Sequence, residues 1–300
     1  MKKKTYLFAL MAMVLTLGSC SDNENGIGGE TSKYITVSTS IGNMTRVATD
    51  AKGGQTFEEG DEISVYAWTG DATVAPETRE RVVNNAINKL TNGSWVSTPQ
   101  MLWKNNRDKH YFIGVYPTAA ISDLSAGEYP FDVNKQTESD LLVAVNKDGL
   151  SYNVDAQQTV PLTFTHVMAK LVVNLTYKNQ WGGIPTVEKV VVGNAAKEAT
   201  INYLTKVVTP STTAKEDFSL PEITENTKYV SVIIPQEDVK QLTIVIGGKN
   251  FVYDNGTPFK LESGKITTVN LEVGRDEIKL GDVKITNWED GSTFSGEALN

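Results

Sequence analysis

Residues 160–177 of the chain have the sequence VPLTFTHVMAKLVVNLTY, in which apolar and polar side chains alternate over most of the length. Alternation with a period of two is typical of a β-strand that buries one of its faces. The many valines and threonines favour the same structure, because their branched side chains pack well on a pleated surface. We therefore expect two long strands here, Val160–Thr165 and Val167–Tyr177.

The same alternation recurs along the rest of the chain, separated by Gly, Pro, Asn and Asp residues that predict turns. Further strands are expected at 35–41, Asp61–Trp68, Lys109–Tyr116, Val187–Val192, Tyr229–Ile234, Leu242–Ile246, Ile266–Val273 and Ile278–Trp288. A helix is expected only at Pro76–Leu90, where Val82 and Val83 also suit a strand. So many short strands predict β-sandwiches or barrels, and because one sandwich takes about 100 residues we expect two.

The composition excludes several classes of protein. The 300 residues include one cysteine and two histidines, which rules out an intramolecular disulfide and the zinc modules built on four such ligands. A formal net charge of -8 argues against a nucleic-acid partner, because phosphate contacts need clustered Lys and Arg. We expect neither a metal nor a cofactor.

The sequence motifs do not indicate an enzyme. The Gly-x-Ser-x-Gly string of a hydrolase nucleophile is absent. His110 and His166 each stand alone in an expected strand, which is typical of a hydrogen-bonded structural histidine. The acidic pairs at 58–59 and 61–62 precede a strand, where solvated turn residues are more typical than the paired carboxylates of glycoside chemistry.

The N-terminus has the features of a lipoprotein signal peptide. Lysines at positions 2–4 precede an apolar run, 6–17, that is shorter than the ~20 residues of a membrane span. Small residues then precede the cysteine in Leu17-Gly18-Ser19-Cys20, which forms a lipobox. This pattern predicts cleavage before Cys20 and a lipid such as palmitate on its thiol. An ordinary signal peptide followed by a chance cysteine is the alternative.

Residues 20–32 contain almost no apolar side chain, which predicts a flexible tether between the lipid and the folded part. The polar and acidic run at 21–26 also resembles the surface-export signal of Bacteroidetes lipoproteins, with a simple solvated linker as the alternative. We therefore divide the start of the chain into a signal peptide at 1–19 and a lipidated tether at 20–32.

Three strings in the body carry a family resemblance. They are TRVATD at 45–50 together with FEEGDEISVY at 57–66, LTFTHVMAKL at 162–171, and VKITNWEDG at 283–291. Their order and spacing behind a lipobox resemble the fimbrillin family of Bacteroidetes lipoproteins, which are subunits of type V pili. The resemblance covers nearly all of the chain that follows the signal peptide.

This resemblance implies an all-β fold of two transthyretin-like β-sandwich domains in tandem, which we place at 33–163 and 164–300. It implies a structural or accessory subunit of a cell-surface pilus (fimbria) that contributes to cell adhesion and is not an enzyme. It also implies an assembly route at the outer membrane. An arginine-specific protease cuts between Arg46 and Val47, the first strand departs, and a strand from another fimbrillin subunit fills the groove to build the extracellular pilus.

The residues themselves support the two ends of this route. An alternating strand at 35–41 lies just before Arg46, which stands in a polar, glycine-containing loop where proteases cut readily. The alternative is that Arg46 is an ordinary exposed arginine. Ile278–Trp288 also alternates, with Gly281 as a break or bulge, so it could donate a strand or simply complete its own domain.

A second class of function is a monomeric surface lipoprotein that binds glycans. Exposed aromatic rings stack on sugars, and the chain contains Trp68, Trp95, Trp103, Trp181 and Trp288. Trp95 and Trp103 flank a short segment that could present them. The competing interpretation is core packing, because tryptophan is on average a buried residue.

Overall fold

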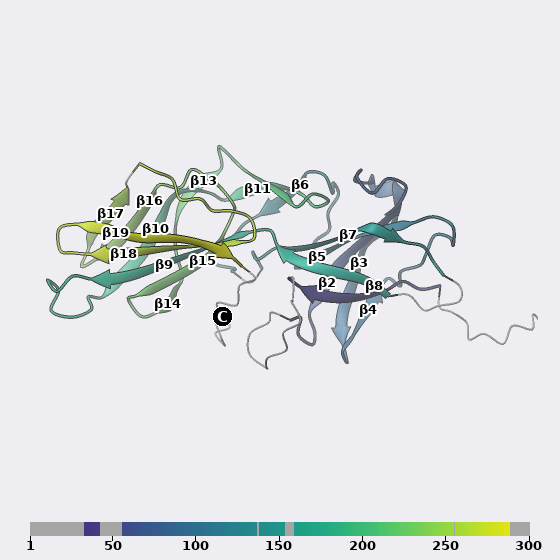
Figure 1. Ribbon diagram of the computed structural model, residues 1–300, viewed down its shortest axis with the longest axis horizontal. Helices are drawn as coiled ribbons and strands as arrows, with labels where there is room; N and C mark the ends of the chain where they lie inside the picture. The colour runs from purple at the N-terminus through teal and green to yellow at the C-terminus, as the bar shows by residue number, and fades with distance from the viewer. Residues whose placement is uncertain (1–32, 43–55, 137, 154–158, 255, 289–300) are drawn as a thin grey trace, which may run out of the picture.

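The computed structural model describes residues 33–42, 56–136, 138–153, 159–254 and 256–288 (Figure 1). The strands are β1 (Thr36–Ile41), β2 (Glu62–Thr69), β3 (Arg81–Thr91), β4 (Ser94–Thr98), β5 (His110–Tyr116), β6 (Gly127–Pro130), β7 (Leu142–Leu150), β8 (Thr159–His166), β9 (Ala169–Tyr177), β10 (Val187–Ala196), β11 (Glu198–Asn202), β12 (Val207–Pro210), β13 (Lys215–Ser219), β14 (Glu222–Thr224), β15 (Lys228–Ile233), β16 (Gln241–Ile246), β17 (Lys249–Asp254), β18 (Lys265–Val273) and β19 (Ile278–Asn287). The helical structure in the described ranges is a single 3-10 turn, η1 (Thr78–Glu80). The all-β fold class is therefore confirmed.

The expectation of a helix at Pro76–Leu90 is wrong. Only the three residues of η1 are helical in this segment. At its start the side chain of Glu80 accepts a hydrogen bond from the Glu77 backbone N–H at 3.0 Å. The chain then extends into β3, and Val83 pairs with Ala67 of β2. Ladder bonds to β2 and burial of Val83 outweigh the local helix preference, as tertiary context commonly does.

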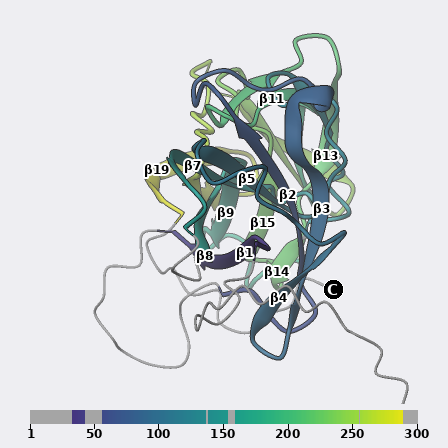
Figure 2. The same ribbon diagram turned by 90° about the vertical axis from the view of Figure 1, so that its right-hand side faces the viewer.

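The first half of the chain forms one seven-stranded sheet in the order β1-β8-β7-β5-β2-β3-β4. This sheet curls until its two ends meet. The Ile35 N–H donates to the Met101 carbonyl at 2.9 Å, and the Trp103 N–H donates to the Lys33 carbonyl at 3.2 Å. Figure 2 views this half from its end and shows β1 between β8 and β4. The start of the described chain thus closes the sheet.

The curled sheet encloses its own hydrophobic core. Inward-facing side chains come from strands all around the curl, including Val37 of β1, Val65 of β2, Phe112 of β5 and Leu162 of β8. All four are buried. A single sheet therefore supplies both walls of this sandwich-like half.

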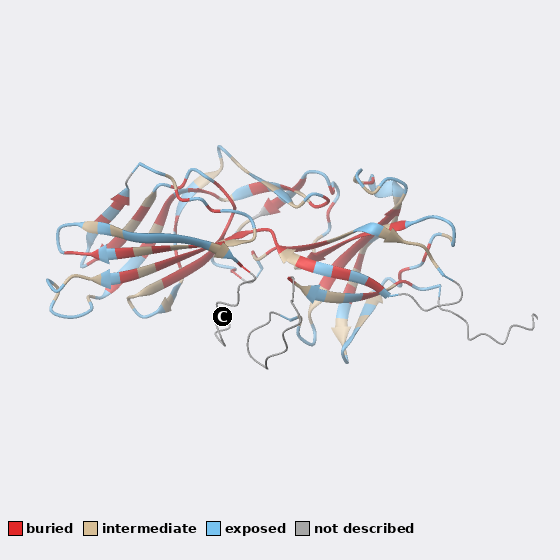
Figure 3. Ribbon diagram, in the orientation of Figure 1, coloured by how far each residue is buried: buried red, intermediate tan, exposed pale blue. Residues whose placement is uncertain are grey.

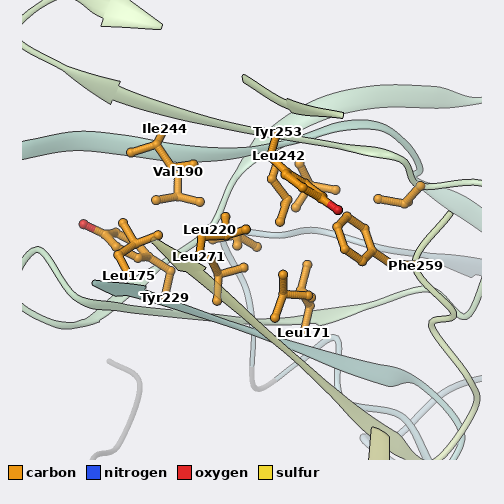
Figure 4. Close-up of a cluster of buried hydrophobic side chains, with 14 of the residues drawn as sticks. Leu171, Leu175, Val190, Leu220, Tyr229, Leu242, Ile244, Tyr253, Phe259 and Leu271 are labelled. Carbon is orange, nitrogen blue, oxygen red and sulfur yellow. The ribbon is translucent and has the colours of Figure 1, made fainter. Parts of the chain in front are cut away.

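The second half is a sandwich of two sheets. The five-stranded sheet has the order β14-β15-β9-β18-β19, and the four-stranded sheet has the order β13-β10-β16-β17. Figure 4 shows Leu171 and Leu271 from the first sheet facing Leu242 and Ile244 from the second. β9 and β18 run parallel through the middle of the five-stranded sheet, and β19 is its edge.

A third cluster of buried side chains joins the two halves. It includes Tyr66 of β2 and Val143 of β7 together with Val172 of β9 and Val230 of β15. β6, from the first half of the sequence, pairs with β11 from the second in a three-stranded sheet with β12. The expected division between residues 163 and 164 falls within β8, whose burial alternates from end to end (Figure 3).

Within the described ranges, no helix is both long and apolar enough to cross a membrane.

Candidate functional site

β1 is an edge strand with two different faces. Val37 points inward and is buried, while Ser38 and Ser40 are exposed on the other face. Its ladder with β8 is parallel and runs from the Thr36–Thr159 pair to the Ile41–Phe164 pair. This alternation is the one that the sequence predicts, and it fixes the register because a slip by one residue would expose the apolar face.

The outer face of β1 is joined to β8 by hydroxyl contacts. The Oγ1 atoms of Thr36 and Thr159 lie 3.3 Å apart, and the Ser40 hydroxyl donates to Thr163 Oγ1 at 3.2 Å. Both contacts are exposed to solvent, so they add little stability. What holds β1 in place is its ladder and its inward side chains.

The inward face of β1 covers a group of aromatic rings. The Trp95 indole N–H donates to Thr39 Oγ1 at 3.0 Å. The ring of Phe57 packs edge-on against Trp95 at 5.3 Å and against Phe164 at 5.1 Å between centroids. Phe164 in turn lies over Gly114, where an added Cβ would approach its ring to 2.6 Å. These rings form an apolar floor beneath β1.

We call the space that β1 fills the β1 slot. Its walls are the edge of β8 and the segment 101–103, which both hydrogen-bond to the chain at 33–42. If β1 left, backbone groups on both walls would lose their partners and the aromatic floor would be uncovered. A groove with these properties binds an extended peptide by strand addition.

The expected cleavage site and lipidation site lie outside the described residues. Cys20, Arg46 and Val47 are in the ranges 1–32 and 43–55. The last described contact before Arg46 is the Gly42 N–H, which donates to the Phe164 carbonyl at 2.8 Å. β1 itself ends at Ile41, five residues before Arg46.

β19 is the other candidate element. It pairs antiparallel with β18 at the edge of the five-stranded sheet, and most of its side chains are exposed (Figure 3). Val283 and Ile285 are 41% and 38% exposed, although they stand opposite the fully buried Val269 and Thr267. The register shifts beside Gly281, where the sequence predicts a break or bulge.

The glycan-binding alternative is motivated by exposed tryptophan rings, and the structure does not provide them. Trp68, Trp103 and Trp288 are buried, and Trp95 and Trp181 are half-buried, so none of the five tryptophans forms an exposed platform. The Trp103 ring packs edge-on against His110 at 5.0 Å between centroids. These tryptophans pack in or against the core, as the competing interpretation expects.

The two histidines have structural partners. His110 accepts a hydrogen bond from the Lys104 N–H at Nε2, and its Nδ1 lies 3.1 Å from the Asp108 carbonyl oxygen. Burial lowers the pKa of His110, which favours the neutral ring. Nδ1 of His166 lies 2.8 Å from Asp140 Oδ1. Among the residues that the structure describes, no three His, Cys, Asp or Glu side chains gather as metal ligands.

The chain is similar to fimbrial proteins over most of its length. A family model described as fimbrillin-like matches residues 45–288. A protein of Bacteroides uniformis named as the fimbrium subunit Fim1C is 24% identical over 315 aligned positions, which cover 97% of each chain.

Solved structures share the fold. A cell adhesion protein from Bacteroides uniformis aligns with a TM-score of 0.62 at 20% identity, covering 86% of this chain and 100% of that one. A cell adhesion protein from Bacteroides ovatus gives 0.61 at 18% identity, with 85% and 98% covered. A fimbrial protein from Bacteroides vulgatus gives 0.52 at 12% identity, with 84% and 99% covered.

Proposed function

Because this chain belongs to the fimbrillin-like family, we propose that it is a structural or accessory pilus subunit assembled by protease-triggered donor-strand exchange. The observation that carries the proposal is the position of β1, an edge strand that covers an apolar floor and ends five residues before Arg46. A strand so placed can be cut from the body without breaking any later strand.

The proposed route begins at the outer membrane. The precursor is exported as a lipoprotein, anchored through the lipid on Cys20 and presented at the cell surface. An arginine-specific protease then cuts between Arg46 and Val47. Because the cut lies after β1, the lipid, the tether and β1 leave the subunit together. The β1 slot is then open to another subunit.

The proposed donor is β19 of a neighbouring subunit. The β1 side chains that face the core are two residues apart, at Val37, Thr39 and Ile41. β19 carries Val283 and Ile285 at the same spacing, and both are partly exposed on its own subunit. A strand with apolar side chains at every second position can pair its backbone with the walls of the β1 slot. At the same time it can place those side chains on the apolar floor.

Cleavage of the purified precursor by an arginine-specific protease should yield a subunit that begins at Val47. Oligomers that resist sodium dodecyl sulfate should follow, because many ladder bonds and buried side chains make each joint slow to open. N-terminal sequencing and unheated gels measure both outcomes. A subunit that begins at Val47 and stays monomeric would contradict the proposal.

Fluorescence supplies a local check on the same reaction. Trp95 loses its bond to Thr39 and its cover when β1 leaves, so its emission should shift to the red and then recover as oligomers form. A Trp95→Phe variant should lack this component while cutting and assembling as before.

Lipidation has its own prediction. A Cys20→Ala precursor should move from the membrane fraction to the soluble fraction, since a lipid on Cys20 would be its anchor. Fractionation followed by immunoblotting measures the change. An intact mass that shows unmodified Cys20 in mature wild-type protein would contradict the lipid anchor.

A further inference from the structure

The end of β19 is attached to the body differently from the rest of the strand. Between Gly281 and Asn287 most side chains are exposed, but the next residue, Trp288, is only 7% exposed. Trp288 belongs to the cluster that joins the two halves of the molecule. The side-chain burial that holds this end of the strand is thus concentrated in one residue.

Trp288 lies face to face with His166, the last residue of β8. The ring centroids are 4.0 Å apart and the ring planes are inclined by 6°. The Lys170 ammonium lies 5.2 Å from the centroid of the indole ring. The backbone N–H of Trp288 donates to the Gly264 carbonyl at 3.0 Å. The indole is therefore held by stacking, by a cation–π contact and by a backbone hydrogen bond.

The socket for this indole is held by contacts that do not involve the indole. The Asp140 carboxylate lies 2.8 Å from Nδ1 of His166 and orients its ring. The turn that presents the Gly264 carbonyl requires glycine, because its φ is +66° and an added Cβ would lie 3.0 Å from the His166 carbonyl oxygen. Neither constraint depends on Trp288, so the socket selects one position for it.

We propose that Trp288 and His166 form an autoinhibitory latch. The latch keeps β19 paired within its own subunit, and so prevents its premature insertion into another subunit, until the strand is donated. The regulatory role of the latch rests on the proposed function, in which β19 is the donor. The stacking contact between Trp288 and His166 does not depend on that function. Without the latch, β19 has an exposed edge and few buried side chains, so its end would open readily.

The experiment measures opening of β19 in the full-length subunit carrying Arg46→Ala and Lys52→Ala, so that trypsin cannot cut between β1 and β2 and release β1. Trypsin cleaves after Lys284 only when the strand leaves its ladder, so the rate of this cut, followed by mass spectrometry, reports the open population. Trp288→Ala should raise the rate by on the order of 10–100-fold, given the burial and stacking of one aromatic ring. Trp288→Phe should keep most of the protection.

Variants of the partner separate stacking from general damage. His166→Phe keeps a flat ring and should stay protected, whereas His166→Ala should be cut as fast as Trp288→Ala. Equal rates for wild type, Trp288→Ala and His166→Ala would overturn the latch. Faster cutting in a chain that never polymerises would leave the latch standing and refute the donor function instead.

Discussion

An Arg46→Ala subunit should remain monomeric after protease treatment that converts the wild-type chain into oligomers. Without the cut, β1 stays covalently attached next to its own slot. The effective concentration of such a tethered strand is on the order of millimolar. At micromolar subunit concentrations a foreign strand is therefore outcompeted by about a thousandfold, which corresponds to about 4 kcal/mol.

The cut removes this advantage and also destabilises the subunit. Ile35 and Val37 are buried, and losing each of them from the core costs about 1.5–3 kcal/mol. Every ladder bond to β8 adds about 0.5–1.5 kcal/mol. These losses are a large share of the 5–15 kcal/mol that typically stabilises a domain. A donor strand that restores them is bound correspondingly tightly.

Arg107→Ala is the matched control for this experiment. Arg107 is an exposed arginine in a loop outside the β1 slot. Its removal should leave cleavage at Arg46 and assembly unchanged. Oligomers formed from uncut Arg46→Ala protein would refute the requirement for cleavage.

The sequence predicts the strands well wherever one face of the strand is buried. Val160–Thr165 and Val167–Tyr177 correspond to β8 and β9, and the expected bulge beside Gly281 is present. The fimbrillin resemblance is confirmed by the family match over residues 45–288. Periodicity predicts these strands because a half-buried strand has apolar side chains on its buried face and polar side chains on its exposed face.

Other features are decided by contacts that no local pattern encodes. β2 is buried on both faces because the cluster that joins the two halves covers its outer side. Its buried residues therefore form a continuous run instead of alternating with exposed ones. The closure of the sheet through Ile35 and Met101 depends on backbone bonds between distant segments. The stacking of Trp288 on His166 is equally non-local, although both residues stand in strings that carry the family resemblance.

The double variant Val283→Asp with Ile285→Asp should fold normally but fail as a donor. Both side chains are more than a third exposed on their own subunit, so the cost to the monomer should stay within about 1 kcal/mol. In the slot of a neighbour they would face the apolar floor under β1. Burying an unpaired carboxylate there costs several kcal/mol, so polymerisation should fall by at least 100-fold. Chain length on unheated gels measures the loss.

Lys284→Asp gives a matched control on the same strand. It changes the net charge by the same two units as the double variant, but Lys284 pairs with Thr268 on the opposite face of the sheet. Polymerisation of this control should be close to wild type. If both variants fail equally, repulsion by added negative charge explains the result and the apolar face of β19 is not the donor surface.

Mixing the two defective subunits tests the whole scheme at once. The Arg46→Ala chain keeps a sound β19 but offers no open slot. The double variant, once cut at Arg46, offers an open slot but has no usable donor face. Each alone should stay monomeric, whereas the mixture should give dimers of one copy of each and nothing longer. Because the only productive joint has the donor of one chain in the slot of the other, longer chains in the mixture would place the donor or the acceptor elsewhere in the molecule.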